Sequence, residues 1–192
     1  MLALQGDYGR HEHQLQLLGV TPVEVRLPQH LADLDALIIP GGESTTMDHL
    51  ITKFGLRGEL ERFCRQRPVW GTCAGMILLA QEIEDNQAGV KPLGVIDIDV
   101  RRVGYGRQVY SAQERIKVDL GGGSNELTVA FIRAPVVTRV GNGVTVLGEF
   151  RGEPVLVTQG RVLAGSFHTE LSDDTRLLRY FLERFVLPAG RE

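Results

Sequence analysis

The first half of the chain alternates short apolar runs with stretches in which apolar residues recur at helical spacing. Four short runs bounded by turn residues predict buried strands, at Met1–Leu4, Val23–Leu27, Ala36–Ile39 and Val69–Trp70. The helical spacing predicts helices at Arg10–Leu18, Thr45–Ile51, Leu56–Arg65 and Met76–Gln81. Continuous apolar strands separated by helices indicate a parallel sheet that is covered on both faces.

After Pro92 the pattern changes to short β-branched stretches separated by glycine-rich turns. Strands of a meander or antiparallel extension are predicted at "VIDIDV", "RIKVDL", "LTVAFI", "VTVLGEF" and "PVLVTQG". Val162–Ser166 predicts one more buried strand, and a last helix capped by Ser172 or Asp173 is expected to run to about Leu187. We therefore expect one α/β domain over residues 1–192: a three-layer fold with a mostly parallel sheet flanked by helices and a β-rich extension.

Composition narrows the class of protein. The chain has 192 residues, of which 43% are hydrophobic, and this is enough for one substantial core. Its formal net charge is −3, so the chain lacks the excess of basic residues that is typical of a nucleic-acid binder. Two cysteines are too few for a disulfide framework or a thiolate metal site, so we expect a cytoplasmic protein. No apolar run approaches the roughly 20 residues of a membrane span, and the N-terminus does not resemble a signal peptide.

The stretch "VWGTCAGMILLA" places Cys73 between Gly71 and Gly75, after a predicted strand and before a predicted helix. This G-x-C-x-G pattern is typical of a nucleophile elbow, in which small neighbours let a tight turn present the reactive side chain. The following helix would favour the thiolate, and the amide of Ala74 would be available to an oxyanion. The alternative is a cysteine that only packs in the core, which is our expectation for Cys64.

A nucleophilic cysteine needs a base and a group that orients the base. His168 follows the strand Val162–Ser166 at its carboxyl end, where open α/β sheets place their active sites. Glu170, two residues later, could hold the imidazole. The alternative is a solvated pair in a loop. His11 and His13 are expected on the solvated surface of a helix. His30 in a loop and His49 in a helix are expected to have no catalytic role.

The stretch "LIIPGGESTTMDHL" runs from a strand through a Pro-Gly-Gly turn into a helix that we expect Ser44 or Thr45 to cap. Such a turn exposes backbone amides that could cradle a phosphate or complete an oxyanion hole. No lysine follows, and Glu43 would repel a phosphate. An oxyanion donor at Gly42, opposite Ala74, therefore fits better, and an ordinary turn with a helix cap remains the alternative.

Three motifs in this order, "PGGES", "GTCAG" and "SFHTEL", resemble those of the class I, triad-type glutamine amidotransferases. The finer motifs "LALQGDYGRHEHQL", "PGGESTTM", "GTCAGMILLA", "YGRQ" and "FIRAP" resemble one branch, the glutaminase subunits of pyridoxal 5′-phosphate synthase. The resemblance covers nearly the whole chain. It implies a flavodoxin-like fold, release of ammonia from glutamine through a γ-glutamyl thioester, and no metal or organic cofactor. The implied partner is a (β/α)₈-barrel synthase subunit that receives the ammonia.

Carried over to this sequence, the resemblance implies that Cys73 is the nucleophile, His168 the base and Glu170 its orienting partner. It also implies oxyanion-hole amides at Gly42 and Ala74. The implied glutamine-binding residues are Gly42, Glu43, Ser44, Arg102, Ile132 and Arg133.

The sequence departs from the family's pattern at three places. Val103 and Gly104 stand where the family usually has asparagine and a small residue, which removes any role borrowed for that asparagine. Thr169 replaces a common proline and would loosen the turn between the histidine and the glutamate. The chain also begins a few residues into the family's first strand.

Three other functions use parts of the same pattern. A glutaminase of another pathway would keep the triad but would not co-purify with a barrel synthase. A γ-glutamyl or other cysteine peptidase would act on peptides without a partner. A redox-sensing or scaffold protein would keep the elbow cysteine and have little need of His168 and Glu170. The sequence favours the synthase glutaminase, and we expect its activity to rise when the synthase is bound.

Overall fold

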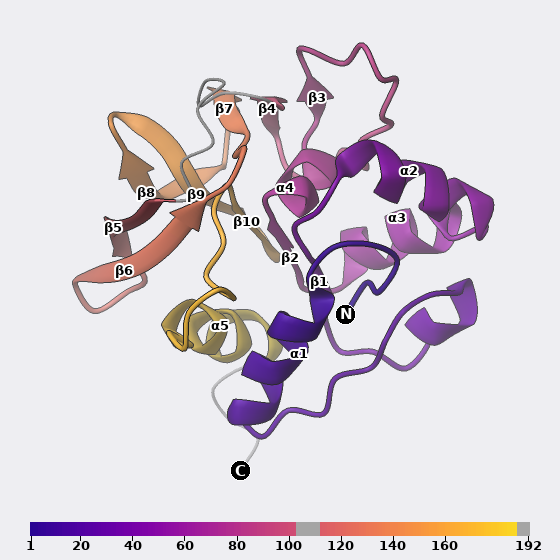
Figure 1. Ribbon diagram of the computed structural model, residues 1–192, viewed down its shortest axis with the longest axis horizontal. Coiled ribbons are helices and arrows are strands. Elements are labelled where there is room, and N and C mark those ends of the chain that lie inside the picture. The colour runs from indigo at the N-terminus through magenta and orange to yellow at the C-terminus, as the bar shows by residue number, and fades with distance from the viewer. Residues whose placement is uncertain (103–111, 188–192) are drawn as a thin grey trace.

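In the computed structural model, which describes residues 1–102 and 112–187, a seven-stranded sheet has the order β1-β2-β10-β9-β8-β5-β6 (Figure 1). β1, β2 and β10 are parallel, and every pair from β10 to β6 is antiparallel. The expected α/β class is confirmed, and the sheet is mixed because its antiparallel part is the β-rich extension. In sheet order the strands are Leu37–Ile39, Val69–Thr72, Val162–Gly165, Glu153–Gln159, Thr145–Phe150, Ala112–Asp119 and Ser124–Phe131.

The first two predicted strands lie beside β1 but form only one bridge. Leu2 pairs in parallel with Val25, and its amide donates to the carbonyl of Ile38 at 2.9 Å. The strands predicted at Met1–Leu4 and Val23–Leu27 are therefore reduced to a single residue pair. The chain leaves the sheet soon after each: it turns at Gly6, which has a φ of 97°, and enters the 3₁₀ helix η1 at Pro28–Leu31.

A smaller sheet joins β3 (Glu82–Ile83), β4 (Ile98–Arg101) and β7 (Val136–Val140) in that order. β3 and β4 are parallel, whereas β4 and β7 are antiparallel. The pattern predicted β4, within "VIDIDV", but not β3 or β7. Two residues carry too little periodicity to predict a strand, and β7 has adjacent buried residues followed by exposed ones rather than an alternation.

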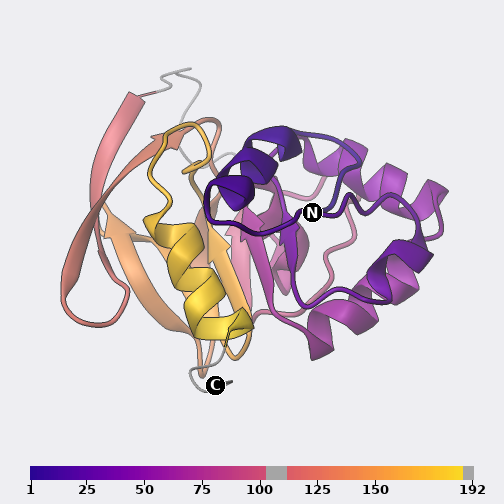
Figure 2. The same ribbon diagram turned by 90° about the horizontal axis from the view of Figure 1, so that it is seen from below.

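Helices cover both faces of the large sheet and create two separate cores (Figure 2). β1 shows the division, because Leu37 and Ile39 pack into one core and Ile38 packs into the other. The first core contains α2 (Ser44–Lys53), α3 (Arg57–Gln66) and α4 (Ala74–Leu79), and the second contains α1 (Tyr8–Leu17) and α5 (Arg176–Phe181). None of the helices in the described part of the chain is long and apolar enough to cross a membrane.

Two predicted helix caps are wrong. α2 is capped by Glu43, whose carboxylate accepts from the amides of Thr45 at 3.0 Å and Thr46 at 2.6 Å. The Glu43 side chain reaches forward to the amides of the first turn, so Ser44 and Thr45 already lie inside the helix. The last helix begins after Thr175 instead of Ser172 or Asp173 and continues as the π-helix η2 (Leu182–Val186).

Candidate active site

Cys73 occupies a strained turn between β2 and α4. Its φ of 51° and ψ of −103° lie outside the regions that non-glycine residues normally adopt. The amide of Cys73 donates to the carbonyl of Gly165 in β10 at 2.8 Å, which fixes the turn against the sheet. The side chain is 6% exposed. The turn therefore has the geometry that the elbow pattern predicts.

The two glycines that flank Cys73 are required by close packing. A Cβ on Gly75 would lie 2.2 Å from the carbonyl oxygen of Ile39 in β1, and one on Gly71 would lie 2.6 Å from the carbonyl carbon of Gly75. Both contacts are with backbone, which cannot move aside cheaply. The glycines therefore let α4 pack directly on the strand ends, which holds the cysteine in place.

His168 follows β10 and is held by a second strand. Its amide donates to the carbonyl of Ala130 in β6 at 2.8 Å, and its carbonyl accepts from the Ala130 amide at 3.0 Å. Nδ1 of the ring lies 2.6 Å from Oε1 of Glu170, which is 3% exposed. The ring also packs on Gly41, where a Cβ would approach Cε1 to 2.3 Å. The structure thus brings together the histidine and glutamate that the sequence singled out.

The charges of this cluster are coupled. Burial disfavours the imidazolium of His168, but interactions with Cys73 and Glu170 outweigh it and raise its pKa to about 10. Burial also opposes ionisation of Glu170, whereas the hydrogen bond to His168 lowers its pKa, and the net direction is down. At neutral pH the site therefore holds a charged imidazolium–carboxylate pair beside Cys73.

A pocket of about 260 Å³ opens beside Cys73 and His168. Ile132 closes one side of it, and its carbonyl oxygen lies 3.9 Å from Cys73 Sγ. Gln5 and Ile77 also line the pocket, although the sequence did not point to them. All six residues expected to bind glutamine line this same pocket: Gly42, Glu43, Ser44, Arg102, Ile132 and Arg133.

Backbone amides near the pocket come from two turns. Ala74 is the first residue of α4, and the N–H groups of a first turn have no acceptor within their own helix. The turn at Gly42 is held by the N-terminal loop, because Gln5 Oε1 accepts from the Glu43 amide at 2.7 Å. Gly6 packs so closely that a Cβ there would lie 1.9 Å from the carbonyl oxygen of Gly41. The feature of the sequence that could have pointed to Gln5 as a pocket residue is its place in the "LALQGDYGRHEHQL" motif.

Glu43 and Arg102 form a charged pair at the rim of the pocket, with Arg102 Nη2 3.4 Å from Glu43 Oε1. Partial burial opposes ionisation of Glu43, but hydrogen bonds from Thr46 and Thr45 lower its pKa to about 2. The amide of Arg102 donates to Asp85 Oδ1 at 2.8 Å, which ties the arginine to the neighbouring loop. Arg102 and Cys73 therefore line the same pocket, with the guanidinium paired to Glu43 at its rim.

The prediction that His11 is solvated is wrong, because the side chain is fully buried. His11, Gln14 and Leu15 follow the helical spacing of the buried face of α1, and this face packs on the segment that carries Glu170. His13 points the other way and is exposed, as expected. The apolar pattern missed His11 because two of the three buried residues on this face are polar.

Cys64 behaves as the expected core residue. It is 2% exposed in α3, and burial raises the pKa of its thiol to about 12. Both cysteines are free thiols. Within residues 1–102 and 112–187, no cluster of histidine, cysteine and carboxylate side chains has the arrangement of a metal site.

The turn between His168 and Glu170 is held by contacts to the backbone of Thr169. Its carbonyl accepts from Gln14 Nε2 at 3.2 Å and from the amide of Ser172 at 3.1 Å. Contacts from α1 therefore hold the turn. Val103, Gly104 and the "YGRQ" motif lie outside the described residues.

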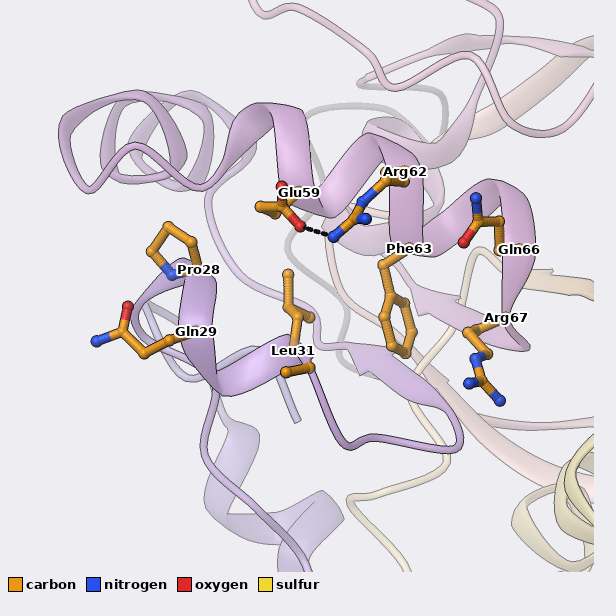
Figure 3. Close-up of a pocket in the computed structure, with 9 residues that line it drawn as sticks. Pro28, Gln29, Leu31, Glu59, Arg62, Phe63, Gln66 and Arg67 are labelled. Carbon is orange, nitrogen blue, oxygen red and sulfur yellow. Dashed lines mark hydrogen bonds and ion pairs between the residues drawn. The ribbon is translucent and has the colours of Figure 1, made fainter.

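A second pocket, of about 500 Å³, lies between η1 and α3 (Figure 3). Leu31 and Phe63 form its apolar floor, and an ion pair between Glu59 and Arg62 lies at its edge. It is larger than the pocket at Cys73, but its lining includes no cysteine or histidine. The chemistry therefore points to the smaller pocket.

Comparison with known proteins finds relatives along nearly the whole chain. The SNO glutamine amidotransferase family matches residues 1–187. The chain is 49% identical to the pyridoxal 5′-phosphate synthase subunit PdxT of Desulforudis audaxviator, covering 95% of this chain and 96% of that one. It is 46% identical to the PdxT of Thermus thermophilus, with 95% of each covered.

Solved structures are similar along nearly the whole chain. A crystal structure of a glutamine amidotransferase is 48% identical, with a TM-score of 0.86 over 94% of this chain and 95% of the other. The structure of PurLQS from Thermotoga maritima is 14% identical, with a TM-score of 0.69 over 95% of this chain and 94% of the other, and shares the fold.

Proposed function

The chain belongs to the SNO glutamine amidotransferase family, and we propose that Cys73, His168 and Glu170 form its catalytic triad. It is a glutaminase, the glutamine-hydrolysing subunit of pyridoxal 5′-phosphate synthase. The observation that supports the triad best is the 2.6 Å contact between His168 and Glu170 beside a cysteine on a strained elbow. A buried charged pair next to a nucleophile is the arrangement that acyl transfer requires.

In the proposed reaction, the thiolate of Cys73 attacks the side-chain amide carbon of glutamine. The amides of Gly42 and Ala74 stabilise the negative charge that develops on the amide oxygen, typically worth about 10²–10³-fold per donor. The imidazolium of His168 gives its proton to the amide nitrogen. The carbon–nitrogen bond then breaks, and ammonia leaves. Neutral His168 then takes a proton from water, which attacks the thioester and releases glutamate and the thiolate.

The rest of the pocket would bind the amino-acid end of glutamine. Arg102 is the proposed contact for its carboxylate, because a guanidinium binds a carboxylate through paired hydrogen bonds. Gly42, Glu43, Ser44, Ile132 and Arg133 would complete the walls. A volume of about 260 Å³ suits a small amino acid and leaves little room for a peptide, which favours glutamine over a peptidase substrate.

We propose that the partner is a (β/α)₈-barrel subunit of the synthase, which receives the ammonia directly. The whole of residues 1–192 would then act as one glutaminase domain. This chemistry uses the chain's own thiol, imidazole and carboxylate, so no cofactor is assigned to it. A cytoplasmic location is part of the proposal, because two free thiols suit a reducing compartment.

The test is glutamate release from glutamine by the wild type and Cys73→Ala, each with and without the cognate synthase subunit. We expect release that needs Cys73 and increases with the synthase. Cysteine-dependent release that is indifferent to the synthase would indicate a glutaminase of another pathway. No release in any mixture, from protein that binds the synthase, would overturn the proposed triad.

A further inference from the structure

α1 presents a buried histidine to the far side of the proposed triad. His11 lies edge-on to the ring of Trp70, with centroids 5.5 Å apart and planes at 85°. Its Nε2 atom is 3.6 Å from Oε2 of Glu170, the carboxylate oxygen that does not face His168. The side chains of His11 and Glu170 have exposed fractions of 0% and 1%. The contact between them is therefore shielded from bulk solvent.

The oxygens of Glu170 differ in what they contact. Oε1 is hydrogen-bonded to His168, whereas Oε2 is buried and has no hydrogen bond in the described part of the chain. Neither ring nitrogen of His11 has one either, among the same residues. Buried polar groups are rarely left unpaired, and a charged oxygen has the most to gain from a donor. His11 Nε2 is placed to supply it after a small rotation of either side chain.

The same helix face holds the backbone around Glu170. Gln14, one turn after His11, donates from Nε2 to the carbonyl of Thr169 at 3.2 Å and to that of Ser172 at 2.9 Å. These contacts fix the segment on both sides of the carboxylate. α1 therefore carries two side chains that together determine where Glu170 lies and how its carboxylate is turned.

We propose that His11 is a positioning residue whose neutral imidazole donates from Nε2 to Glu170 Oε2 and thereby holds Oε1 toward His168. The inference rests on the proposed triad and extends it by one residue. His11 does not contact substrate in this scheme. It acts only through Glu170, by keeping the carboxylate in the plane that His168 needs.

The charges around His11 favour its neutral form. Burial is the largest influence and lowers the pKa of His11. Glu170 is the adjacent anion, and Asp7 adds a weaker negative charge, whereas His168 and the amino group of Met1 add positive charge. Glu170 has one negative charge, and the imidazolium of His168 already neutralises it. A neutral donor is what the remaining oxygen can accommodate.

The test compares His11→Met, which removes the donor at similar volume, with His11→Gln, which keeps an N–H donor. Both are assayed in the complex with the synthase subunit. We expect His11→Met to lower kcat for glutamine about tenfold with KM nearly unchanged. The acid limb of its pH profile should move to higher pH, because Glu170 loses a donor to its charged form. His11→Gln should restore most of kcat, and the exposed His13→Met is the matched control on the same helix.

Equal loss of kcat in His11→Met and His11→Gln, or no loss in His11→Met, would contradict the positioning role. The rate of Cys73 alkylation by iodoacetamide as a function of pH gives a readout that needs no glutamine. It should shift in His11→Met and not in His13→Met, even if glutamine proves to be the wrong substrate. An unshifted alkylation profile would overturn the inference, whereas wild-type protein inactive on glutamine would overturn the proposed function alone.

A further measurement keeps the proposal testable if His11→Met does not fold. ¹⁵N NMR of the histidine rings, in wild-type full-length chain bound to the synthase, reports which nitrogen carries the proton. The proposal requires that His11 be neutral with its proton on Nε2 at pH 7. A proton on Nδ1 alone would exclude the contact with Glu170.

Discussion

Nδ1 of His168 lies 2.6 Å from Oε1 of Glu170, and the backbone of the same histidine is paired with Ala130 in a neighbouring strand. In this contact the Nδ1 proton of His168 is donated in a hydrogen bond to the carboxylate, which leaves Nε2 to face the cysteine. The backbone pairing fixes the position of His168, which follows β10, against Ala130 in β6. Orientation and position of the ring are therefore set by two independent interactions.

Replacing the carboxylate tests the first interaction. Glu170→Gln should lower kcat for glutamine by about 10²–10⁴-fold with little change in KM, because the imidazole loses its orienting charge. Glutamate release in the synthase complex measures the effect. The surface variant Glu183→Gln should behave as the wild type. A loss below threefold in Glu170→Gln would contradict the assigned role.

The elevated pKa of His168 gives a prediction about titration. Among the interactions that raise this pKa to about 10 against burial, the hydrogen bond with Cys73 is the largest single one. In Cys73→Ala we therefore expect the pKa of His168 to fall toward its ordinary value of about 6.5, although Glu170 should keep it above that value. NMR titration of the His168 ring from pH 5 to 10 in both proteins measures the shift. An identical titration would mean that thiol and imidazole do not interact.

The elbow glycine makes a prediction about folding. A Cβ on Gly75 would overlap the backbone oxygen of Ile39 at 2.2 Å, so Gly75→Ala should lower the free energy of unfolding by several kcal/mol or prevent folding. Gly58→Ala is the matched control, because Gly58 lies in α3 with open space around its Cα. That change should stabilise the chain by about 0.5–1 kcal/mol. Urea unfolding distinguishes the two.

The helix cap at Glu43 makes a prediction about acid stability. Its pKa is lowered to about 2 in the folded chain, against an ordinary value of about 4.3 when unfolded. A lowered carboxylate pKa contributes stability that is present above about pH 4.3 and is lost as the pH falls through about 2. Glu43→Gln should therefore flatten the dependence of unfolding free energy on pH between about 5 and 3. The exposed Glu82→Gln, measured in parallel, should leave that slope unchanged.

Arg102 tests how glutamine is bound. Removal of its charge in Arg102→Met should raise KM about ten- to a hundredfold with a smaller effect on kcat, because the guanidinium would contact the carboxylate and not the reacting amide. Arg101→Met is the control, since Arg101 pairs with Glu84 on the outside of the small sheet. Steady-state glutaminase kinetics give both constants. A fall in kcat alone would place Arg102 in another role.

Much of the fold and the site followed from local pattern. The elbow at Cys73, the helices α1 to α4 and most strands of the β-rich extension were predicted, because each is encoded by neighbouring residues. The motif "SFHTEL" singled out His168 and Glu170 because a strand end and a carboxylate two residues away are visible in the sequence. The family resemblance supplied the pocket residues, which the structure gathers around Cys73.

What the sequence did not predict depends on contacts between distant segments. The burial of His11 is caused by residues more than 150 positions away, since Gln14 on the same face bonds Thr169 and Ser172. The cap at Glu43 was missed because serine and threonine are the commoner caps and stood next to it. The two N-terminal segments predicted as strands lie beyond β1, the edge strand of the large sheet, and form only one bridge there. Local pattern does not show how many residues will pair at a sheet edge.

The pairing of Ala130 with His168 makes the hairpin of β5 and β6 an arm that reaches from His168 to a turn at Gly121–Gly123. All three turn glycines are exposed and have positive φ values, so this end of the arm tolerates attachments far better than its base does. A one-residue insertion near Ala130 would instead reverse which face each side chain occupies and move the imidazole with it.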